Sequence, residues 1–303
     1  MQIYLPIAGL SVNALVIIAL GALVGVLSGL FGVGGGFLTT PLLIFYGIPP
    51  TVAVASATTQ ITGASVSGVF AHLRRGGVDF RMGLVMIAGG IIGSLVGAFI
   101  FRILQQSGQI DLVIGFLYVA LLGSIGLLML KDALVTLGWV KLAAAPNQRR
   151  RHNRWVASLP LRWRFYSSGL FISPLAPLAL GFGTGMLTVL LGVGGGFVLV
   201  PAMIYILGMA PRAVVGTSLV MILAVSAVTT VIQSLTNHSV DIVLAGLLLI
   251  GGVIGAQYGT MLATRLKPDL LRLALAVIIL LVALRMALGL AWHPDEIFTI
   301  EVR

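Results

Sequence analysis

Two glycine runs, each followed by a proline, are the residues of this chain with the clearest capacity for chemistry. The sequence Gly-Val-Gly-Gly-Gly occurs at 32–36 and again at 192–196, and the prolines are Pro41 and Pro201. Three glycines in succession adopt positive φ easily, and each costs about 1 kcal/mol in a helix. We therefore expect each run to end a long helix and to precede a short one, with the proline in its first turn, near Thr40 and Val200. Free N–H groups and the positive dipole end at such a helix start favour an anion.

Hydroxyl and amide side chains follow each glycine run and could complete an anion site. Such groups donate hydrogen bonds to an oxyanion without the desolvation cost of a buried ammonium. The alternative is that the hydroxyls bond back to carbonyls of their own helix. The candidate substrate-binding residues are Gly34, Gly35, Gly36, Phe37, Thr39, Thr40, Ser56, Thr58, Thr59, Gln60, Gly194, Gly195, Gly196, Phe197, Thr217 and Ser218.

Few ionisable residues fall inside the apolar segments. Arg285 lies within the last apolar run, where it either serves an anion pathway or extends its charged end to the membrane surface. Asp79 and Asp241 occupy equivalent positions at predicted helix starts. A carboxylate there caps free N–H groups, and a proton relay is the alternative role.

Composition excludes several classes of function. With no cysteine and four scattered histidines, thiol catalysis and iron–sulfur ligation are excluded, and little remains from which to build a metal site. The chain also lacks a Gly-x-x-x-x-Gly-Lys-Ser/Thr motif for ATP, a Gly-x-Ser-x-Gly nucleophile motif and a His-Glu-x-x-His motif. We expect neither an enzyme nor a cofactor.

The elements that must position these residues are membrane helices. The chain is 59% apolar and only 9% charged, so most of its surface must face lipid. Segments 37–46 and 197–207 are too short to cross a bilayer core of about 30 Å and should enter it and return on the same side. Eight runs have the length of a membrane helix: 14–31, 51–73, 82–101, 111–130, 169–191, 213–235, 242–263 and 270–292.

The two halves of the chain are copies of one unit. Besides the glycine runs and prolines, Val78-Asp79 matches Val240-Asp241, and residues 89–93 (Gly-Gly-Ile-Ile-Gly) match 251–255 (Gly-Gly-Val-Ile-Gly), at an offset of 160–162 residues. We expect a first transmembrane repeat at 1–130, a basic linker at 131–166 and a second repeat at 167–303.

The distribution of positive charge predicts the orientation. Eight of the 18 Lys and Arg residues lie in the 131–166 segment, which argues against a nucleic-acid surface and for a cytoplasmic loop beside anionic lipid. That choice leaves 15 basic residues on the cytoplasmic side and two outside, with both termini outside. Loops at equivalent positions of the two repeats then lie on opposite sides of the membrane. The expected fold is an all-α multi-pass membrane protein of two inverted repeats, an architecture typical of transporters.

These motifs resemble the sulfite exporter TauE/SafE family, also called the TSUP permeases. The likeness rests on 32–41 with its copy 192–201, on Ala55-Ser56 and Gly216-Thr217-Ser218, and on the two Gly-Gly-x-Ile-Gly segments. The resemblance implies a secondary transporter of small anions, often sulfur-containing ones such as sulfite, thiosulfate or sulfoacetate, in a bacterial or archaeal inner membrane.

The leading hypothesis is therefore an alternating-access permease that holds an anion between the two broken segments and uses a gradient of protons or another ion. A passive anion channel and a carrier of small carboxylates are the alternatives. Import or export, the coupling ion and the oligomeric state, a homo-oligomer included, stay open on sequence alone.

Overall fold

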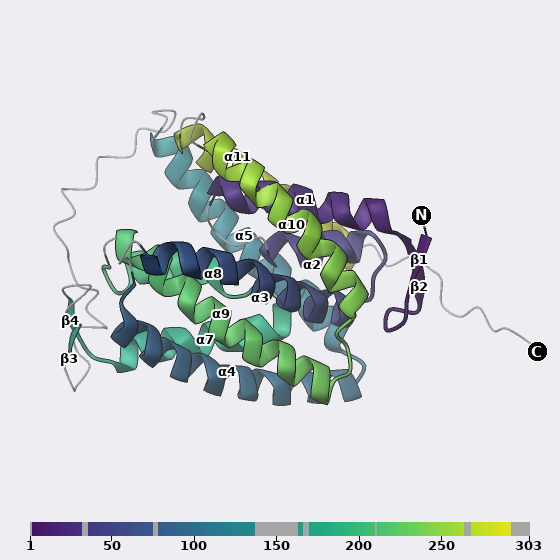
Figure 1. Ribbon diagram of the computed structural model, residues 1–303, viewed down its shortest axis with the longest axis horizontal. Coiled ribbons are helices and arrows are strands. Elements are labelled where there is room, and N and C mark those ends of the chain that lie inside the picture. Colours follow the sequence, from purple (N-terminus) through teal and green to yellow (C-terminus); the bar gives the residue numbers. More distant parts are fainter. Residues whose placement is uncertain are drawn as a thin grey trace, which may run out of the picture.

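The computed structural model describes residues 2–31, 36–74, 78–136, 163–165, 170–209, 211–263 and 268–291. These ranges hold eight long helices and two short ones, running side by side across the molecule (Figure 1). The helices are α1 Ala14–Phe31, α2 Gly36–Phe45, α3 Pro50–Arg74, α4 Phe80–Gln106, α5 Ile110–Thr136, α7 Leu175–Leu191, α8 Gly196–Tyr205, α9 Pro211–Thr236, α10 Ile242–Ala263 and α11 Pro268–Ala291.

The helices have the composition of membrane segments. Five of those described, α4, α5, α9, α10 and α11, are long and apolar enough to cross a bilayer, while α1 and α7 are shorter apolar helices. Helix α3, with 25 residues, carries the Ser/Thr/Gln cluster. The short helices α2 and α8 have ten residues each, about 15 Å of helix, so neither alone can cross. The chain is a multi-pass membrane protein.

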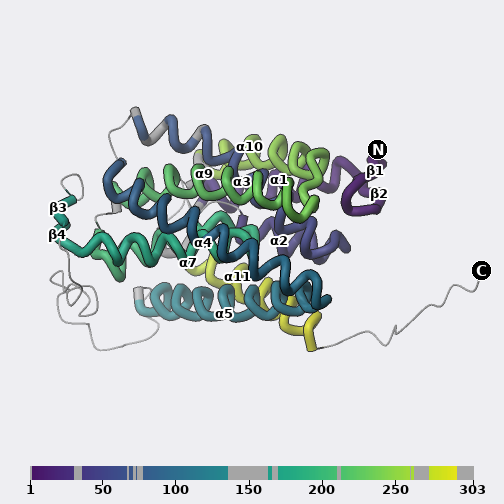
Figure 2. Tube along the Cα trace, turned by 90° about the horizontal axis from the view of Figure 1, so that it is seen from below, coloured from purple at the N-terminus to yellow at the C-terminus, as the bar shows by residue number. Residues whose placement is uncertain are grey.

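Two β-hairpins, which the sequence analysis did not anticipate, precede the first helix of each half. Strand β1 (Gln2–Leu5) pairs with β2 (Leu10–Asn13), and β3 (Trp163–Phe165) pairs with β4 (Leu170–Ile172). The hairpins lie at opposite ends of the helix bundle (Figures 1 and 2). The helix expected from residue 169 begins only at Leu175, because β4 and the turn at Ser173–Pro174 come first.

Glycines bring pairs of helices from different halves into backbone contact. Helix α1 packs along α10, and α4 packs along α7. A Cβ added to Gly255 would lie 2.0 Å from the carbonyl oxygen of Ala22, and one added to Gly93 would lie 2.0 Å from that of Phe182. Only glycine permits such approach, as in small-residue packing of membrane helices. The Gly-Gly-x-Ile-Gly segments therefore serve the α1–α10 and α4–α7 contacts.

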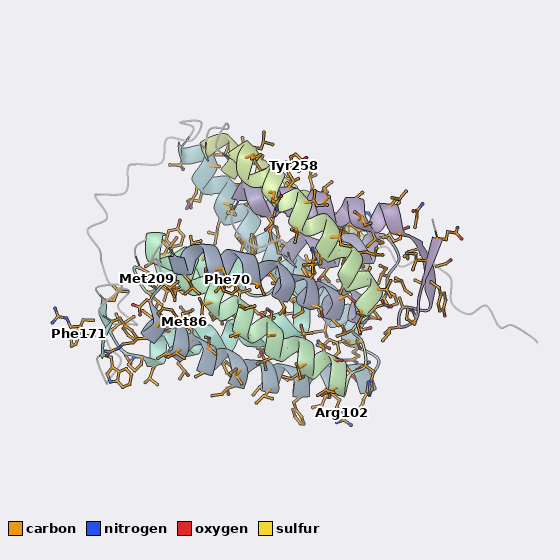
Figure 3. All side chains as sticks on the ribbon, in the orientation of Figure 1. Phe70, Met86, Arg102, Phe171, Met209 and Tyr258 are labelled. Atoms are coloured by element: carbon orange, nitrogen blue, oxygen red, sulfur yellow. The ribbon has the colours of Figure 1, made fainter. Side chains whose placement is uncertain are left out.

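Each hairpin packs on an apolar cluster at one end of the bundle. The β1–β2 cluster joins Leu5 and Val12 to Leu43, Ile48, Val52, Ala53, Leu244 and Leu248. The β3–β4 cluster joins Phe165, Leu170 and Ile172 to Met82, Met86, Leu199, Met203, Leu207, Met209 and Val214. Met86 and Met209 lie towards the β3–β4 end, and Arg102 lies at the other end (Figure 3).

Candidate functional site

The second glycine run interrupts the helix as its composition predicts. Helix α7 ends at Leu191, and Gly192, Gly194 and Gly195 have φ of 68°, 68° and 72°. Helix α8 then starts at Gly196 with Gly195 as its N-cap and no side chain capping it. No described residue accepts a hydrogen bond from the N–H of Gly196 or Phe197. The first run, with the candidate residues Gly34 and Gly35, lies outside the described residues.

The prediction that the short helices begin near Thr40 and Val200 is wrong. They begin at Gly36 and Gly196, so Pro41 and Pro201 are the sixth residues of their helices. The Gly195 carbonyl already accepts from the N–H of Val198 and Leu199, so the helix starts at the break itself. Each proline removes one hydrogen bond of a short helix, and the N–H groups of Gly196 and Phe197 at the break have no acceptor in the part of the chain that the structure describes.

The two short helices meet at their starts. The rings of Phe37 and Phe197 stack with centroids 4.5 Å apart and planes 11° apart. A Cβ added to Gly36 would lie 3.0 Å from the carbonyl oxygen of Val193. Residues 36–37 of one half therefore lie against residues 193–197 of the other, as the sequence analysis expects for a shared site.

Two equivalent isoleucines pack onto this meeting point. The side chain of Ile61, on α3, lies where Cβ atoms added to Gly36 and Gly194 would fall, and Ile222, on α9, lies near Gly194. Both isoleucines are buried. In this structure apolar side chains fill the space beside the breaks, so a substrate there must displace them.

Ser56 and Thr217 link the halves through the two helix-capping aspartates. The N–H of Asp241 donates to the Ser56 hydroxyl at 3.3 Å, and the N–H of Asp79 donates to the Thr217 hydroxyl at 2.9 Å. The aspartates accept from the N–H of Leu244 and Met82, each at 3.1 Å. Capping, one of the two roles considered for Asp79 and Asp241, is therefore confirmed. Asp241 also accepts from the N–H of Ile7 in the β1–β2 turn.

Most hydroxyls of the α3 cluster donate within their own helix. Thr58 donates to the carbonyl of Val54, Thr59 to that of Ala55, and Thr62 to that of Thr58. Ser218 on α9 likewise donates to the Val215 carbonyl. These hydroxyls keep only acceptor lone pairs, which an anion cannot use.

Gln60 joins three helices. Its amide oxygen accepts from the Thr39 hydroxyl at 3.1 Å, and its amide nitrogen donates to the Leu248 carbonyl of α10 at 3.3 Å. The side chain is 5% exposed. Gln60 thus ties α2 and α3 of the first half to α10 of the second.

Tyr118 on α5 is a residue of this region that the sequence analysis missed. It is fully buried, and its hydroxyl donates to the carbonyl of Leu191, the last residue before the second break. That hydrogen bond supplies a partner to a helix-end carbonyl inside an apolar bundle, where water cannot. A single tyrosine in an apolar segment gives no sign of which backbone group it meets.

We expect Tyr118→Phe to lower the stability of the protein by about 1–3 kcal/mol, because the Leu191 carbonyl then stays buried without a donor. The midpoint of thermal unfolding in detergent measures the effect. Tyr258→Phe is the matched control, because Tyr258 is 67% exposed and should tolerate the change. Equal midpoints for the two variants would contradict the role assigned to Tyr118.

Arg285 lies outside the meeting point of the breaks. Its guanidinium lies 5.2 Å from the ring centroid of Phe45, at the far end of α2 from Gly36, and the residue is exposed. Among the described residues there is also no group of three or more His, Cys, Asp or Glu side chains that could hold a metal ion. The candidate site is therefore made of backbone, hydroxyls and apolar side chains.

Comparison with known proteins gives one consistent family. Residues 17–286 match the model of the family described as sulfite exporter TauE/SafE. A "Probable membrane transporter protein" of Xylella fastidiosa is 30% identical over 276 residues, covering 90% of this chain and 94% of that protein. The "Probable membrane transporter protein YjnA" of Bacillus subtilis is 28% identical, covering 89% of this chain and 98% of the relative.

A plant relative matches over a smaller region. The "Sulfite exporter TauE/SafE family protein 3" of Arabidopsis thaliana is 35% identical over 97 residues, which are 31% of this chain and 20% of that protein. No solved structure matches the chain significantly.

Proposed function

Because the chain belongs to the sulfite exporter TauE/SafE family, we propose that this membrane transporter is a secondary active permease of small anions, most directly sulfur oxyanions or organosulfonates. The observation that carries the proposal is the meeting of the two short helices at Phe37 and Phe197, beside a glycine break whose Gly196 and Phe197 N–H groups have no described acceptor. Helix starts of this kind favour negative charge, and unwound backbone inside a membrane requires a buried or cavity-lining place.

The arrangement of helices supports inverted repeats. Helices α1 and α10 form one pair, and their counterparts in the other half, α7 and α4, form another. The hydrogen bonds follow the same pattern: Asp241 of the second half donates to Ser56 of the first, and Asp79 of the first half donates to Thr217 of the second. Hairpins β1–β2 and β3–β4 lie at opposite ends of the bundle (Figure 2). A twofold relation within the membrane plane accounts for all three observations.

Alternating access then requires the two ends to open in turn. The β1–β2 cluster and the β3–β4 cluster are the two closures, and both are buried in this structure. Opening either would connect the breaks to one side of the membrane only. With both clusters packed, the breaks reach neither side of the membrane, which corresponds to an occluded state of the transport cycle.

The proposed transport is tested with purified protein in proteoliposomes. Sulfite, thiosulfate, sulfoacetate and small carboxylates are offered in the presence and absence of a proton gradient. Uptake of a sulfur anion that saturates and responds to the gradient supports a coupled carrier. Unsaturable uptake with large ionic currents would instead identify a channel, and selective carboxylate uptake would reassign the substrate.

We also propose that the 131–166 loop and the β3–β4 end face the cytoplasm, with both termini outside, from the 15-to-2 division of basic residues. Single cysteines at Asn147 and Gln109 are available because the protein has none of its own. An impermeant maleimide added to intact cells should label Gln109→Cys and not Asn147→Cys. Labelling of Asn147→Cys and not of Gln109→Cys would show that the protein has the opposite orientation in the membrane.

A further inference from the structure

Thr40 carries a fully buried hydroxyl that makes no hydrogen bond of normal geometry with any described residue. Its side chain is 0% exposed, and the Tyr118 hydroxyl lies close to it without forming a hydrogen bond of normal geometry. A buried hydroxyl left unpaired costs about 1–3 kcal/mol. Such a group in a native protein calls for an explanation, and a role in holding a ligand is one.

The Thr40 hydroxyl faces the second break. A Cβ added to Gly192 would lie 3.1 Å from its oxygen. The Tyr118 hydroxyl gives its own proton to the Leu191 carbonyl, so towards Thr40 it can only accept, and an anion would compete with it for the Thr40 proton. Thr40 belongs to α2, so the first half of the chain brings an O–H without a hydrogen bond of normal geometry to the break, where the N–H groups of Gly196 and Phe197 have no acceptor among the described residues.

The second half offers nothing equivalent. Counting from Pro41 and Pro201, the counterpart of Thr40 is Val200, and the counterpart of Thr39 is Leu199. The two breaks thus differ in their donors. An anion at the Gly192–Gly196 break gains a hydroxyl that the mirror-related position lacks.

The charge of the surroundings bears on the charge of the ligand. No Lys, Arg or His occurs in α1, α2, α7 or α8, or in the two glycine runs. The solvation energy that an ion loses on burial grows with the square of its charge, so a dianion loses about four times as much as a monoanion. Fixed dipoles gain only in proportion to the charge, and no counter-charge makes up the difference.

We propose that Thr40 donates its hydroxyl proton in a hydrogen bond to an anion held by the backbone N–H groups of Gly196 and Phe197, and that this site selects singly charged anions such as sulfonates or hydrogensulfite over dianions such as sulfate. This inference rests on the proposed function and specifies its ligand. Thr40 is a binding residue, and Tyr118 positions the break by holding Leu191.

The test measures binding and stability on the same variants. Purified protein is titrated calorimetrically with methanesulfonate, hydrogensulfite, thiosulfate and sulfate, and unfolding midpoints are recorded without ligand. Thr40→Val should weaken monoanion binding about tenfold or more, because one hydrogen bond to a charged group is lost. Its midpoint should stay equal or rise, because without ligand the buried Thr40 hydroxyl makes no hydrogen bond of normal geometry with a described residue. Thr40→Ser should bind like the parent protein.

Thr39→Val is the matched control, on the same helix with the same change. Its hydroxyl donates to Gln60, so this variant should lose stability. If Thr40→Val binds normally, or loses stability as Thr39→Val does, the role given to Thr40 is wrong. If sulfate or thiosulfate binds as tightly as the monoanions, the charge selectivity is wrong. Failure of every anion to bind the parent protein would instead overturn the proposed function itself.

Discussion

Replacing Gly195 by valine is expected to abolish anion transport. Gly195 has φ of 72°, a conformation that a β-branched residue adopts only with strain, and its added Cβ would lie 3.1 Å from the Cβ of Thr184. The side chain would also block the approach of an anion to the start of α8. By the repeat, Gly35→Val should have the same effect.

Transport by proteoliposomes measures this effect against two controls. Gly183→Val lies in α7, where an added Cβ meets nothing within 4 Å, so transport should persist. Arg285→Gln should also transport, because Arg285 lies against Phe45 and away from the breaks. Normal transport by both Gly195→Val and Gly35→Val, with Arg285→Gln inactive, would replace the backbone site with a side-chain charge site.

Replacing Gly255 by alanine is expected to destabilise the protein by about 3 kcal/mol or more, a large effect for one methyl group. The new Cβ would lie 2.0 Å from the backbone oxygen of Ala22, so helices α1 and α10 must separate. Gly93→Ala should act in the same way on α4 and α7. The loss of folded, monodisperse protein in size-exclusion chromatography and the fall in unfolding midpoint measure the change.

Gly246→Ala is the matched control for Gly255→Ala. It makes the same substitution in the same helix at an exposed position, where the added Cβ meets nothing within 4 Å. Because alanine favours helix more than glycine, this variant should be as stable as the parent or slightly more stable. A Gly255→Ala protein that unfolds at the same temperature would show that α1 and α10 do not pack as described.

Much of the fold could be predicted from the sequence. The ends of the long helices agree with those of the apolar runs within six residues, and α1 and α10 agree at both ends. In a membrane, every buried backbone group needs an internal partner, so an apolar run of this length leaves helix as the main solution. The glycine break at 192–195 was also predictable, because glycine composition acts locally on φ.

The remaining features depend on contacts between distant segments. The hairpins were missed because strands of three and four residues are too short to give a periodic signal. Pro41 and Pro201 misplaced the helix starts, because a proline is tolerated deeper in a short helix than its preference suggests. Thr58 and Thr40 look alike in sequence. Only the structure separates a hydroxyl bonded to its own helix from one that faces the opposite break.

The most direct test of the account is to locate the bound anion. A crystal grown with bromomethanesulfonate, a monoanion whose bromine scatters anomalously, gives the position without assumption. We expect the sulfonate oxygens within hydrogen-bond distance of the Gly196 and Phe197 N–H groups and the Thr40 hydroxyl, with Ile61 displaced. An anion bound instead at Arg285, or at any site away from the two glycine breaks, would contradict the account.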